Sequence, residues 1–398
     1  MYNKLTLKDF ELKGKKVLLR VDFNVPMNEA GNVTSDKRIV ETLPTIQYLM
    51  EKGAKIIICS HLGRPDGKVV PEFSLKPVVE HLKKLLRCPI LFTGEVVGIE
   101  TRKMVRNMQD GDIVVLENLR FEAGEEANDG EFAKKLASLA DIFCNDAFGT
   151  MHRAHASTVG VTKFLPSCVG FLVEREVQMF GNLLTNPKRP LVVVMGGSKI
   201  KDKINLISNL INIADTILIG GAMAYTFLEA KGFSMGHSTV EKDRIPLAKI
   251  LLEKAEKQGT KILLPIDHVV AEEFNFIAES RVVSTTDFGK KDIGMDIGPK
   301  TVKLFGNEIS KAKTVFWNGP MGVFEFANFA GGTRSIAEIL VKSGAVSIVG
   351  GGDSASALEK LQMSNMVTHL STGGGAALKL LEGNGLPGLN AIMDKVGD

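Results

Sequence analysis

The segment LVVVMGGSKIKDKINLISNLI, residues 191–211, decides the fold class. Its first five residues are apolar without polar alternation, which predicts a strand covered on both faces. Two glycines and a lysine follow, and then Ile204, Ile207 and Ile211 recur on one helical face, with Asp202 as the expected N-cap. A strand, a glycine-rich loop and a helix in this order are typical of a βαβ crossover in a parallel sheet.

The same unit recurs along the whole chain. Apolar runs occupy residues 17–25, 55–59, 90–92, 113–116, 142–144, 191–195, 216–219, 261–264, 314–317, 346–349 and 367–370. Helical patterns separate them, so we predict an α/β protein with two doubly wound, mainly parallel-sheet (Rossmann-like) domains facing each other across a hinged cleft. An amphipathic helix at 171–184 and a polar linker with two prolines, ending at Pro190, form the expected hinge. The predicted domains are therefore 1–170 and 191–382, joined by 171–190.

Composition restricts the function classes. The 398 residues include 44% hydrophobic ones and carry a net charge of +3, which is too balanced for a nucleic-acid coat. We find no signal-peptide core and no apolar run of membrane-spanning length, so we expect a soluble cytoplasmic protein. The four cysteines, Cys59, Cys88, Cys144 and Cys168, form no CxxC pair, and we expect buried free thiols.

Basic and polar side chains follow the apolar runs of the first half. They are Arg20, Asp22, Asn24, His61, Arg64, Asn118, Arg120 and Arg153, with Arg38 in a further polar loop. Ligands of parallel sheets bind beyond the carboxyl ends of the strands, and guanidinium groups match carboxylate and phosphate oxygens. The ordinary interpretation of any single arginine is a surface residue that is solvated or ion-paired. Repetition at successive strand ends favours a pocket for a small polyanion.

His152 and His155 have the spacing of an HxxH metal motif. No cysteine or carboxylate pattern completes such a site, and Arg153 between them would repel a cation. We therefore interpret the two histidines as part of the anion pocket or as satisfied structural residues.

The runs of the second half end in glycine. They continue into Gly196-Gly197-Ser198-Lys199, Gly220-Gly221-Ala222, Asn318-Gly319-Pro320, Gly350-Gly351-Gly352-Asp353-Ser354 and Ser371-Thr372-Gly373-Gly374-Gly375. Glycine lets a ligand approach the backbone, and helix N-termini favour anions, so these loops predict a nucleotide or phosphate site. Asp353 is a candidate Mg²⁺ ligand or a helix N-cap, and Glu325 could accept hydrogen bonds from ribose hydroxyls or be a surface carboxylate.

Two familiar nucleotide motifs do not apply. The P-loop pattern GxxxxGK[ST] is absent, and the single GxGxxG, at Gly383–Gly388, follows a helix pattern and contains Pro387. An NAD-dependent dehydrogenase would need that fingerprint in its first βα turn. A hinged anion-binding protein of the periplasmic type would need a secretion signal and would leave the second glycine set unexplained.

These loops, in this order, resemble the phosphoglycerate kinase family almost end to end. The motifs are RVDFNVP at 20–26, SHLGRP at 60–65, ENLRF at 117–121 and HRAHAS at 152–157, then GGSK at 196–199 with Asp202 and Lys203, WNGP at 317–320, GGGD at 350–353 and STGGG at 371–375. The resemblance implies reversible phosphoryl transfer from 1,3-bisphosphoglycerate to ADP with Mg²⁺, by a monomer. It also implies that residues 383–398 return to the first domain.

Matched residue by residue, the resemblance implies three sets of site residues. The phosphoglycerate set is Asp22, Phe23, Asn24, Arg38, His61, Leu62, Gly63, Arg64, Arg120 and Arg153. The nucleotide set is Lys199, Lys203, Gly220, Gly221, Gly294, Asn318, Glu325, Gly351, Gly352, Asp353 and Ser354, with Asp353 also holding the metal. The catalytic set is Arg38, Lys199, Gly351 and Gly374. Ala222 stands where the family usually has a third glycine, which leaves the assignment unaffected.

Overall fold

The computed structural model describes residues 3–395, which divide into two compact units. Unit 1 contains the chain up to Gln178 together with the segment from Gly385 on, and unit 2 is Met179–Asn384. The border lies within helix α6 (Phe171–Thr185), whereas the sequence suggested a separate connecting segment at 171–190.

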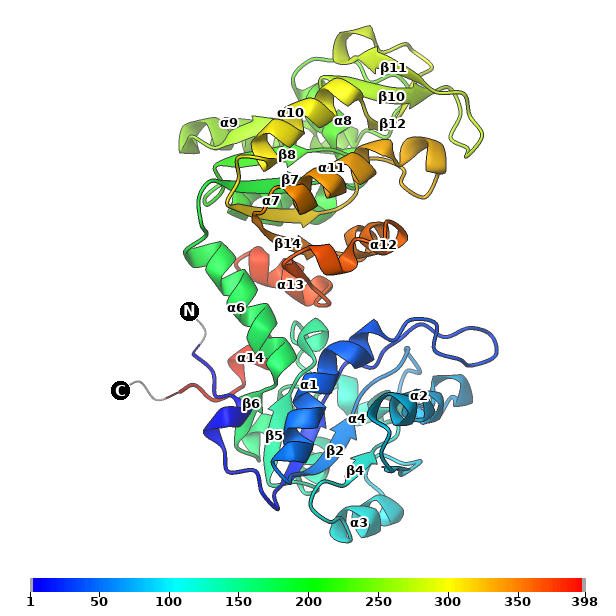
Figure 1. Ribbon diagram of the computed structural model, residues 1–398, viewed down its shortest axis with the longest axis vertical. Coiled ribbons are helices and arrows are strands. Elements are labelled where there is room, and N and C mark those ends of the chain that lie inside the picture. Colours follow the sequence, from blue (N-terminus) through cyan, green and yellow to red (C-terminus); the bar gives the residue numbers. More distant parts are fainter. Residues whose placement is uncertain (1–2, 396–398) are drawn as a thin grey trace. The chain divides into compact units, whose positions relative to one another are not determined.

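Unit 1 is built on six parallel strands (Figure 1). Their order is β3 (Ile90–Phe92), β4 (Ile113–Val115), β2 (Lys55–Cys59), β1 (Lys16–Arg20), β5 (Ile142–Asn145) and β6 (Ser167–Val169). The central strands are buried on both faces, as their continuous apolar character predicted. Helices α1 (Lys37–Glu51) and α2 (Lys76–Leu86) contribute their apolar stripes to the core of one face. The remaining helices are α3 (Ile99–Arg106), α4 (Ala123–Glu126) and α5 (Gly130–Ala137).

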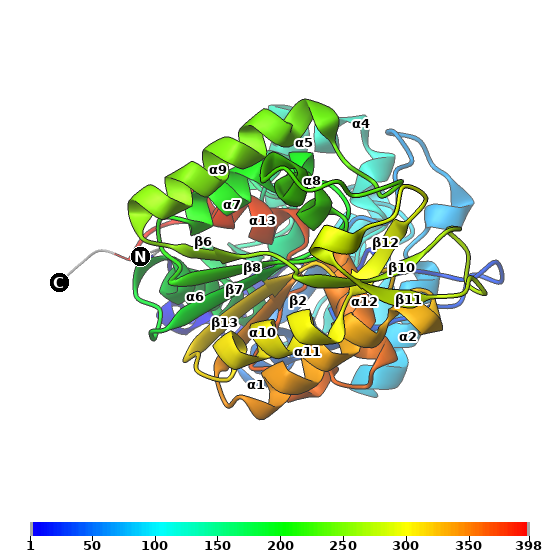
Figure 2. The same ribbon diagram turned by 90° about the horizontal axis from the view of Figure 1, so that it is seen from above.

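Unit 2 repeats the design with strand order β15 (His369–Leu370), β14 (Val346–Gly350), β13 (Thr314–Asn318), β7 (Leu191–Met195), β8 (Thr216–Ile219) and β9 (Lys261–Leu263), all parallel. Figure 2 shows α7 (Ile204–Leu210), α8 (Met223–Ala230) and α9 (Ile245–Gln258) on one side of this sheet, and α10 (Pro299–Ile309) and α11 (Gly331–Lys342) on the other. Helices α12 (Gly352–Lys360) and α13 (Gly375–Leu381) follow β14 and β15. The predicted parallel α/β architecture of both halves is confirmed.

Unit 2 also carries a small antiparallel sheet that the sequence analysis did not predict. It contains β10 (Asp267–Ala271), β11 (Arg281–Ser284) and β12 (Ile293–Ile297), with β10 in the middle. Ala271 and Met295 from this sheet form a separate small core with Phe329. The sheet adds a second wall beside the parallel sheet of the same unit.

Several local predictions need correction. The run at 17–25 forms a strand only as far as Arg20, because the chain then leaves the sheet and the N–H of Phe23 donates to the hydroxyl of Ser60. Asp202 does not cap a helix, because it lies inside a 3₁₀ turn, Lys201–Lys203, and α7 begins after it. Asp353 is likewise in the first turn of α12, whose N-cap is Gly351.

The four cysteines are free thiols, and Cys59, Cys144 and Cys168 are buried as expected, whereas Cys88 is half-buried. Within residues 3–395 no helix has the length and apolar character needed to cross a membrane.

The C-terminal segment lies in unit 1, where short helix α14 (Pro387–Asn390), red in Figure 1, is placed near β6. The N–H of Gly388 donates to the carbonyl of Met151 and that of Met393 to the hydroxyl of Ser167 in β6. At the other end of the chain, the N–H of Leu5 donates to the carbonyl of Met393. The first and last described segments are therefore hydrogen-bonded to each other in unit 1.

Candidate active site

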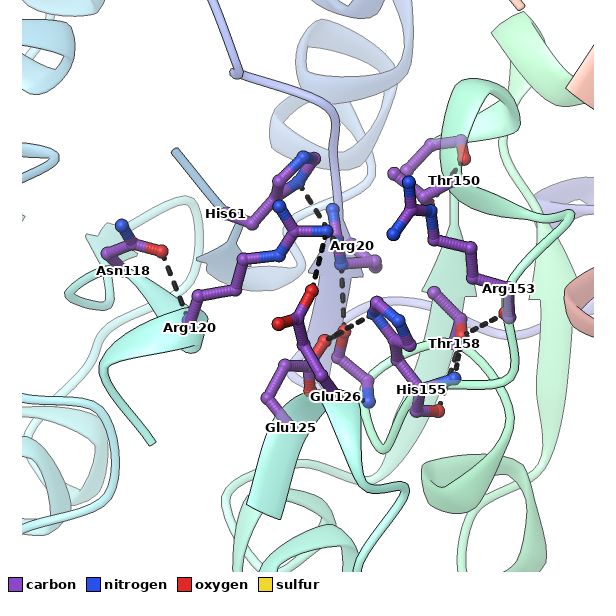
Figure 3. A network of polar contacts seen from close by, with 12 residues as sticks. Arg20, His61, Asn118, Arg120, Glu125, Glu126, Thr150, Arg153, His155 and Thr158 are labelled. Carbon is purple, nitrogen blue, oxygen red and sulfur yellow. Dashed lines mark hydrogen bonds and ion pairs between the residues drawn. The ribbon is translucent and has the colours of Figure 1, made fainter. Parts of the chain in front are cut away.

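One edge of unit 1 collects five basic side chains, which we call the basic edge: Arg20, Arg38, His61, Arg120 and Arg153. Strands β4, β2, β1 and β5 are neighbours in the sheet. Arg20 is the last residue of β1, and Arg120, His61 and Arg153 lie beyond the carboxyl ends of β4, β2 and β5. Arg38 comes from the first turn of α1. Figure 3 shows Arg20, His61, Arg120 and Arg153 gathered together. The sequence analysis expected residues at successive strand ends to lie close together, and these four side chains do.

Arg38 is held in place by the loop after β1. Its Nη1 donates to both oxygens of Asp22, at 3.1 Å each, and to the carbonyl of Asn24 at 3.0 Å. Asn24 then ties this loop to the next one, because its Oδ1 accepts from the N–H of Gly63 at 3.0 Å. Asp22 and Asn24 therefore have a visible role in orienting Arg38 and the loop after β2.

Arg120 is held in the same way by the loops after β2 and β4. Its Nη1 donates to the carbonyl of Gly63 at 2.7 Å, and its Nη2 is 3.1 Å from the carboxylate of Glu126. Asn118 bonds both the N–H and the carbonyl of Leu62. Burial lowers the pKa of Arg120, and Glu126 opposes that shift.

His61 in the basic edge and His155 beside it both have lowered pKa values. Burial, and then Arg20, Arg120, Arg38 and His155, hold the pKa of His61 well below its ordinary value. Burial, and then Arg20, Arg120, Arg153 and His152, lower the pKa of His155 to about 4. The positive charge of the basic edge therefore comes from its arginines.

The other predicted residues of unit 1 occupy different settings. Arg153 is half-buried and its Nε is 3.3 Å from Nε2 of His152, whereas Arg64 is exposed. The side chains of Phe23 and Leu62 lie in the apolar core, so only their backbones can face a ligand. Among the described residues, no group of three or more His, Cys, Asp or Glu has metal-binding geometry.

In unit 2 the loops after β7 and β13 are joined at the point where the strand order reverses. The N–H of Gly196 donates to the carbonyl of Asn318, and that of Gly197 to the carbonyl of Pro320. Lys203 Nζ reinforces this junction, with the carbonyl oxygens of Gly196 at 2.7 Å and Asn318 at 3.3 Å. Burial lowers the pKa of Lys203 to about 8, although Asp353 and Asp202 oppose the shift. The Lys203 ammonium thus bonds the two loops to each other, whereas the Lys199 side chain is exposed.

A cavity of about 280 Å³ opens beside this junction. Of the predicted nucleotide residues, Gly221, Gly294, Glu325 and Asp353 line it. The lining does not include Gly220, Asn318, Gly351, Gly352 or Ser354. Two of them hold nearby loops, because the Ser354 hydroxyl accepts the N–H of Gly319 at 2.6 Å and Asn318 donates to the carbonyl of Gly350 at 2.8 Å. Gly374, with φ of +48°, is the N-cap of α13.

The glycines of this cavity are required by close packing. A Cβ on Gly294 would meet the hydroxyl of Tyr225 at 2.1 Å, and one on Gly221 would meet the N–H nitrogen of Gly197 at 2.5 Å. Larger residues at these positions would clash with these neighbouring protein atoms, so both positions require glycine. The cavity is lined by apolar residues such as Ile293 and Met295 and by the carboxylates of Glu325 and Asp353, so it suits a ligand with an apolar part and a polar part, as a nucleotide has.

Sequence reasoning missed several lining residues of the cavity: Ser198, Tyr225, Thr239, Phe274, Ile293, Met295 and Val323. Ser198 lies inside the GGSK motif at 196–199, and Val323 lies two residues before Glu325. Tyr225, Phe274 and Ile293 come from α8 and the antiparallel sheet region, and no glycine pattern marks them. Only the fold brings them to the cavity.

Known proteins are similar to this chain over nearly its whole length. The model of a family described as phosphoglycerate kinase matches residues 7–384. A phosphoglycerate kinase of Clostridium kluyveri is 50% identical over 398 residues, covering 99% of this chain and 100% of the relative. One from Clostridium botulinum is 51% identical over 397 residues, with 99% and 100% covered.

Solved structures agree with these relatives. The structure of phosphoglycerate kinase from Coxiella burnetii superposes with a TM-score of 0.90 at 40% identity and covers 98% of each chain. That from Pyrococcus horikoshii OT3 has a TM-score of 0.83 at 33% identity, with 97% of this chain and 98% of the other covered.

Proposed function

Since this chain belongs to the phosphoglycerate kinase family, we propose that it transfers a phosphoryl group reversibly from 1,3-bisphosphoglycerate to ADP, giving 3-phosphoglycerate and ATP. The observation that carries the proposal is the pairing of two sites of different chemistry in one chain. Unit 1 has the basic edge, which suits a small polyanion, and unit 2 has the glycine-lined cavity, which suits a nucleotide.

In unit 1, His61 and the arginines of the predicted phosphoglycerate set, Arg38, Arg64, Arg120 and Arg153, would bind the phosphoglycerate. Guanidinium forks fixed by Asp22, Asn24 and Gly63 match its phosphate and carboxylate oxygens without reorganising. The acceptor in the reverse direction is a carboxylate, already ionised at neutral pH, so no general base is required. Catalysis then depends on charge stabilisation and on in-line positioning of donor and acceptor oxygens.

In unit 2, the cavity would bind the nucleotide, with Glu325 near the ribose and the loops at Gly351, Gly352 and Gly374 offering backbone amides to phosphates. Asp353 supplies a carboxylate in the cavity wall, which fits the one or two carboxylates that Mg²⁺ takes beside phosphate oxygens. A bound Mg²⁺ would neutralise phosphate charge. Exposed Lys199 can reach a ligand, and we propose that its contact and that of Arg38 strengthen in the transition state.

Water would hydrolyse an acyl phosphate, so the reacting groups need to be enclosed. Because the phosphoglycerate and nucleotide residues belong to different units, we propose a closure on binding both substrates, with residues 171–190 as part of the hinge.

The deciding experiment is ATP formation from 1,3-bisphosphoglycerate and ADP in a coupled assay, with and without Mg²⁺. We expect turnover with Mg²⁺ and a large loss after chelation. An NAD-dependent dehydrogenase or a non-enzymatic anion-binding protein would form no ATP under either condition, and that result would refute the proposal.

A further inference from the structure

We propose that Arg20 and Glu125 are positioning residues that hold His61 as a neutral imidazole with its proton on Nε2. His61 then serves the basic edge as a directional hydrogen-bond donor and not as a cation. The identity of the ligand that receives this bond rests on the proposed function, but the state of His61 itself does not.

The protonation state of His61 follows from its contact with Arg20. Nη2 of Arg20 is 3.3 Å from Nδ1 of His61, as Figure 3 shows, and both side chains are buried. A guanidinium group can only donate hydrogen bonds, and it stays protonated in proteins. Nδ1 must therefore be the acceptor and carry no proton. The ring's single proton is left on Nε2.

Arg20 can deliver this bond because its other nitrogens are fixed. Nε donates to the hydroxyl of Ser157 at 2.9 Å, and Nη1 donates to the carbonyl of Val21. The side chain is 1% exposed, so it has almost no solvent to replace a lost partner. Its planar fork thus aims one N–H at His61 in a way that a lysine ammonium could not.

Glu125 balances the buried charge of Arg20 through Ser157. The hydroxyl of Ser157, which accepts from Arg20, donates to Oε1 of Glu125 at 2.5 Å, and the N–H of Ser157 donates to Oε2 at 3.0 Å. Glu125, in α4, is fully buried, which is unusual because glutamate side chains mostly lie at the protein surface. A buried cation needs such a partner, and Glu125 is the acid next to the Arg20–Ser157 pair.

The groups around His61 also oppose a second proton. Arg20, Arg120 and Arg38 are cations near the ring, and His155, on the far side of Glu125, is neutral. An imidazolium here would add a charge to a site already crowded with like charges. The neutral Nε2–H form instead adds direction to the recognition of an oxygen ligand while the arginines supply the charge.

The first test is spectroscopic and uses the ligand-free wild-type chain. Long-range ¹⁵N–¹H correlation spectra of ¹⁵N-labelled protein distinguish the two neutral tautomers from the cation, and His61→Gln assigns the signal. We expect one Nε2–H tautomer from pH 6 to 8. A protonated ring, an Nδ1–H tautomer or a mixture in this range would overturn the proposal, whatever the outcome of the ATP assay.

The second test separates positioning from general structure. Arg20→Lys keeps the charge and loses the fork, so we expect a tautomer mixture at His61 and a KM for 3-phosphoglycerate raised about tenfold, with a smaller change in kcat and in the KM for ATP. Glu125→Gln keeps the shape and loses the charge, and we expect the same direction of change. Arg102→Gln, on an exposed site of α3, is the control and should match wild type. An unaltered His61 spectrum in Arg20→Lys would contradict the positioning role.

Discussion

At the scale of residues, the basic edge combines fixed arginines with neutral histidines. Asp22 and the carbonyl of Asn24 orient Arg38, and the carbonyl of Gly63 orients Arg120. Such contacts preorganise charge before a ligand arrives, which is the usual source of electrostatic catalysis. A side chain that is already oriented loses little entropy on binding.

The clearest residue-scale prediction concerns Arg38. We expect Arg38→Ala to lower kcat by about 100-fold or more, since a lost transition-state contact typically has that cost, while the Kd of ATP stays near wild type. Steady-state kinetics and calorimetric titration with ATP measure the two quantities. Arg102→Ala serves as a surface control. A loss confined to ATP affinity would contradict the role given to Arg38.

At the scale of elements, the long continuous strands and the crossover helices could be predicted because burial on both faces leaves an unbroken apolar run, as in Leu191–Met195. The antiparallel strands could not be predicted from the sequence in this way. Arg281–Ser284 is half exposed, and Asp267–Ala271 begins with buried polar residues whose partners, such as Thr301, are distant in sequence. For the same reason the motifs located the candidate site loops but not Tyr225 or Phe274, which only tertiary packing brings to the cavity.

Helix α6 depends at its start on one buried acid, Asp146. Its Oδ1 accepts the N–H of Leu172 at 2.9 Å and that of Val173 at 3.2 Å. Burial raises the pKa of Asp146 from 3.8 to about 6, against the opposing effect of hydrogen bonds from Thr45, Val173 and Leu172. The native state therefore binds this proton more tightly than the unfolded chain does, so ionised Asp146 destabilises the fold at neutral pH.

We accordingly predict a pH-dependent effect of Asp146→Asn, which keeps an acceptor oxygen for the helix. The stability of the variant relative to wild type should be most favourable above pH 6. It should decline by up to about 3 kcal/mol as the pH falls from 6 towards 4, where wild-type Asp146 becomes protonated. Paired calorimetric unfolding at several pH values measures the difference. Asp66→Asn, at an exposed position, should show no such trend, and a difference that grows on acidification would refute the assignment.

At the scale of the whole molecule, each unit has its own sheet, core and candidate ligand site. Phosphoryl transfer requires that donor and acceptor oxygens come within bonding reach. Under the proposed function the two sites have to act together. Helix α6 contributes residues to both units, which is why we propose it as part of the hinge.

The corresponding prediction is a change in dimensions on ligand binding. We expect small-angle X-ray scattering to give a smaller radius of gyration with 3-phosphoglycerate and a non-hydrolysable ATP analogue together than with neither. Each ligand alone serves as the control and should give a smaller change. An unchanged radius with both ligands bound would refute closure.

The return of the last residues to unit 1 has a consequence for biosynthesis. A ribosome delivers the chain from the N-terminus, so all of Met179–Asn384 emerges before Gly388 and Met393 can reach Met151 and Ser167. Unit 2 can therefore begin to fold before the segment that completes unit 1 has been synthesised. The segment from Gly385 on, which packs in unit 1, is thus synthesised after the whole of unit 2.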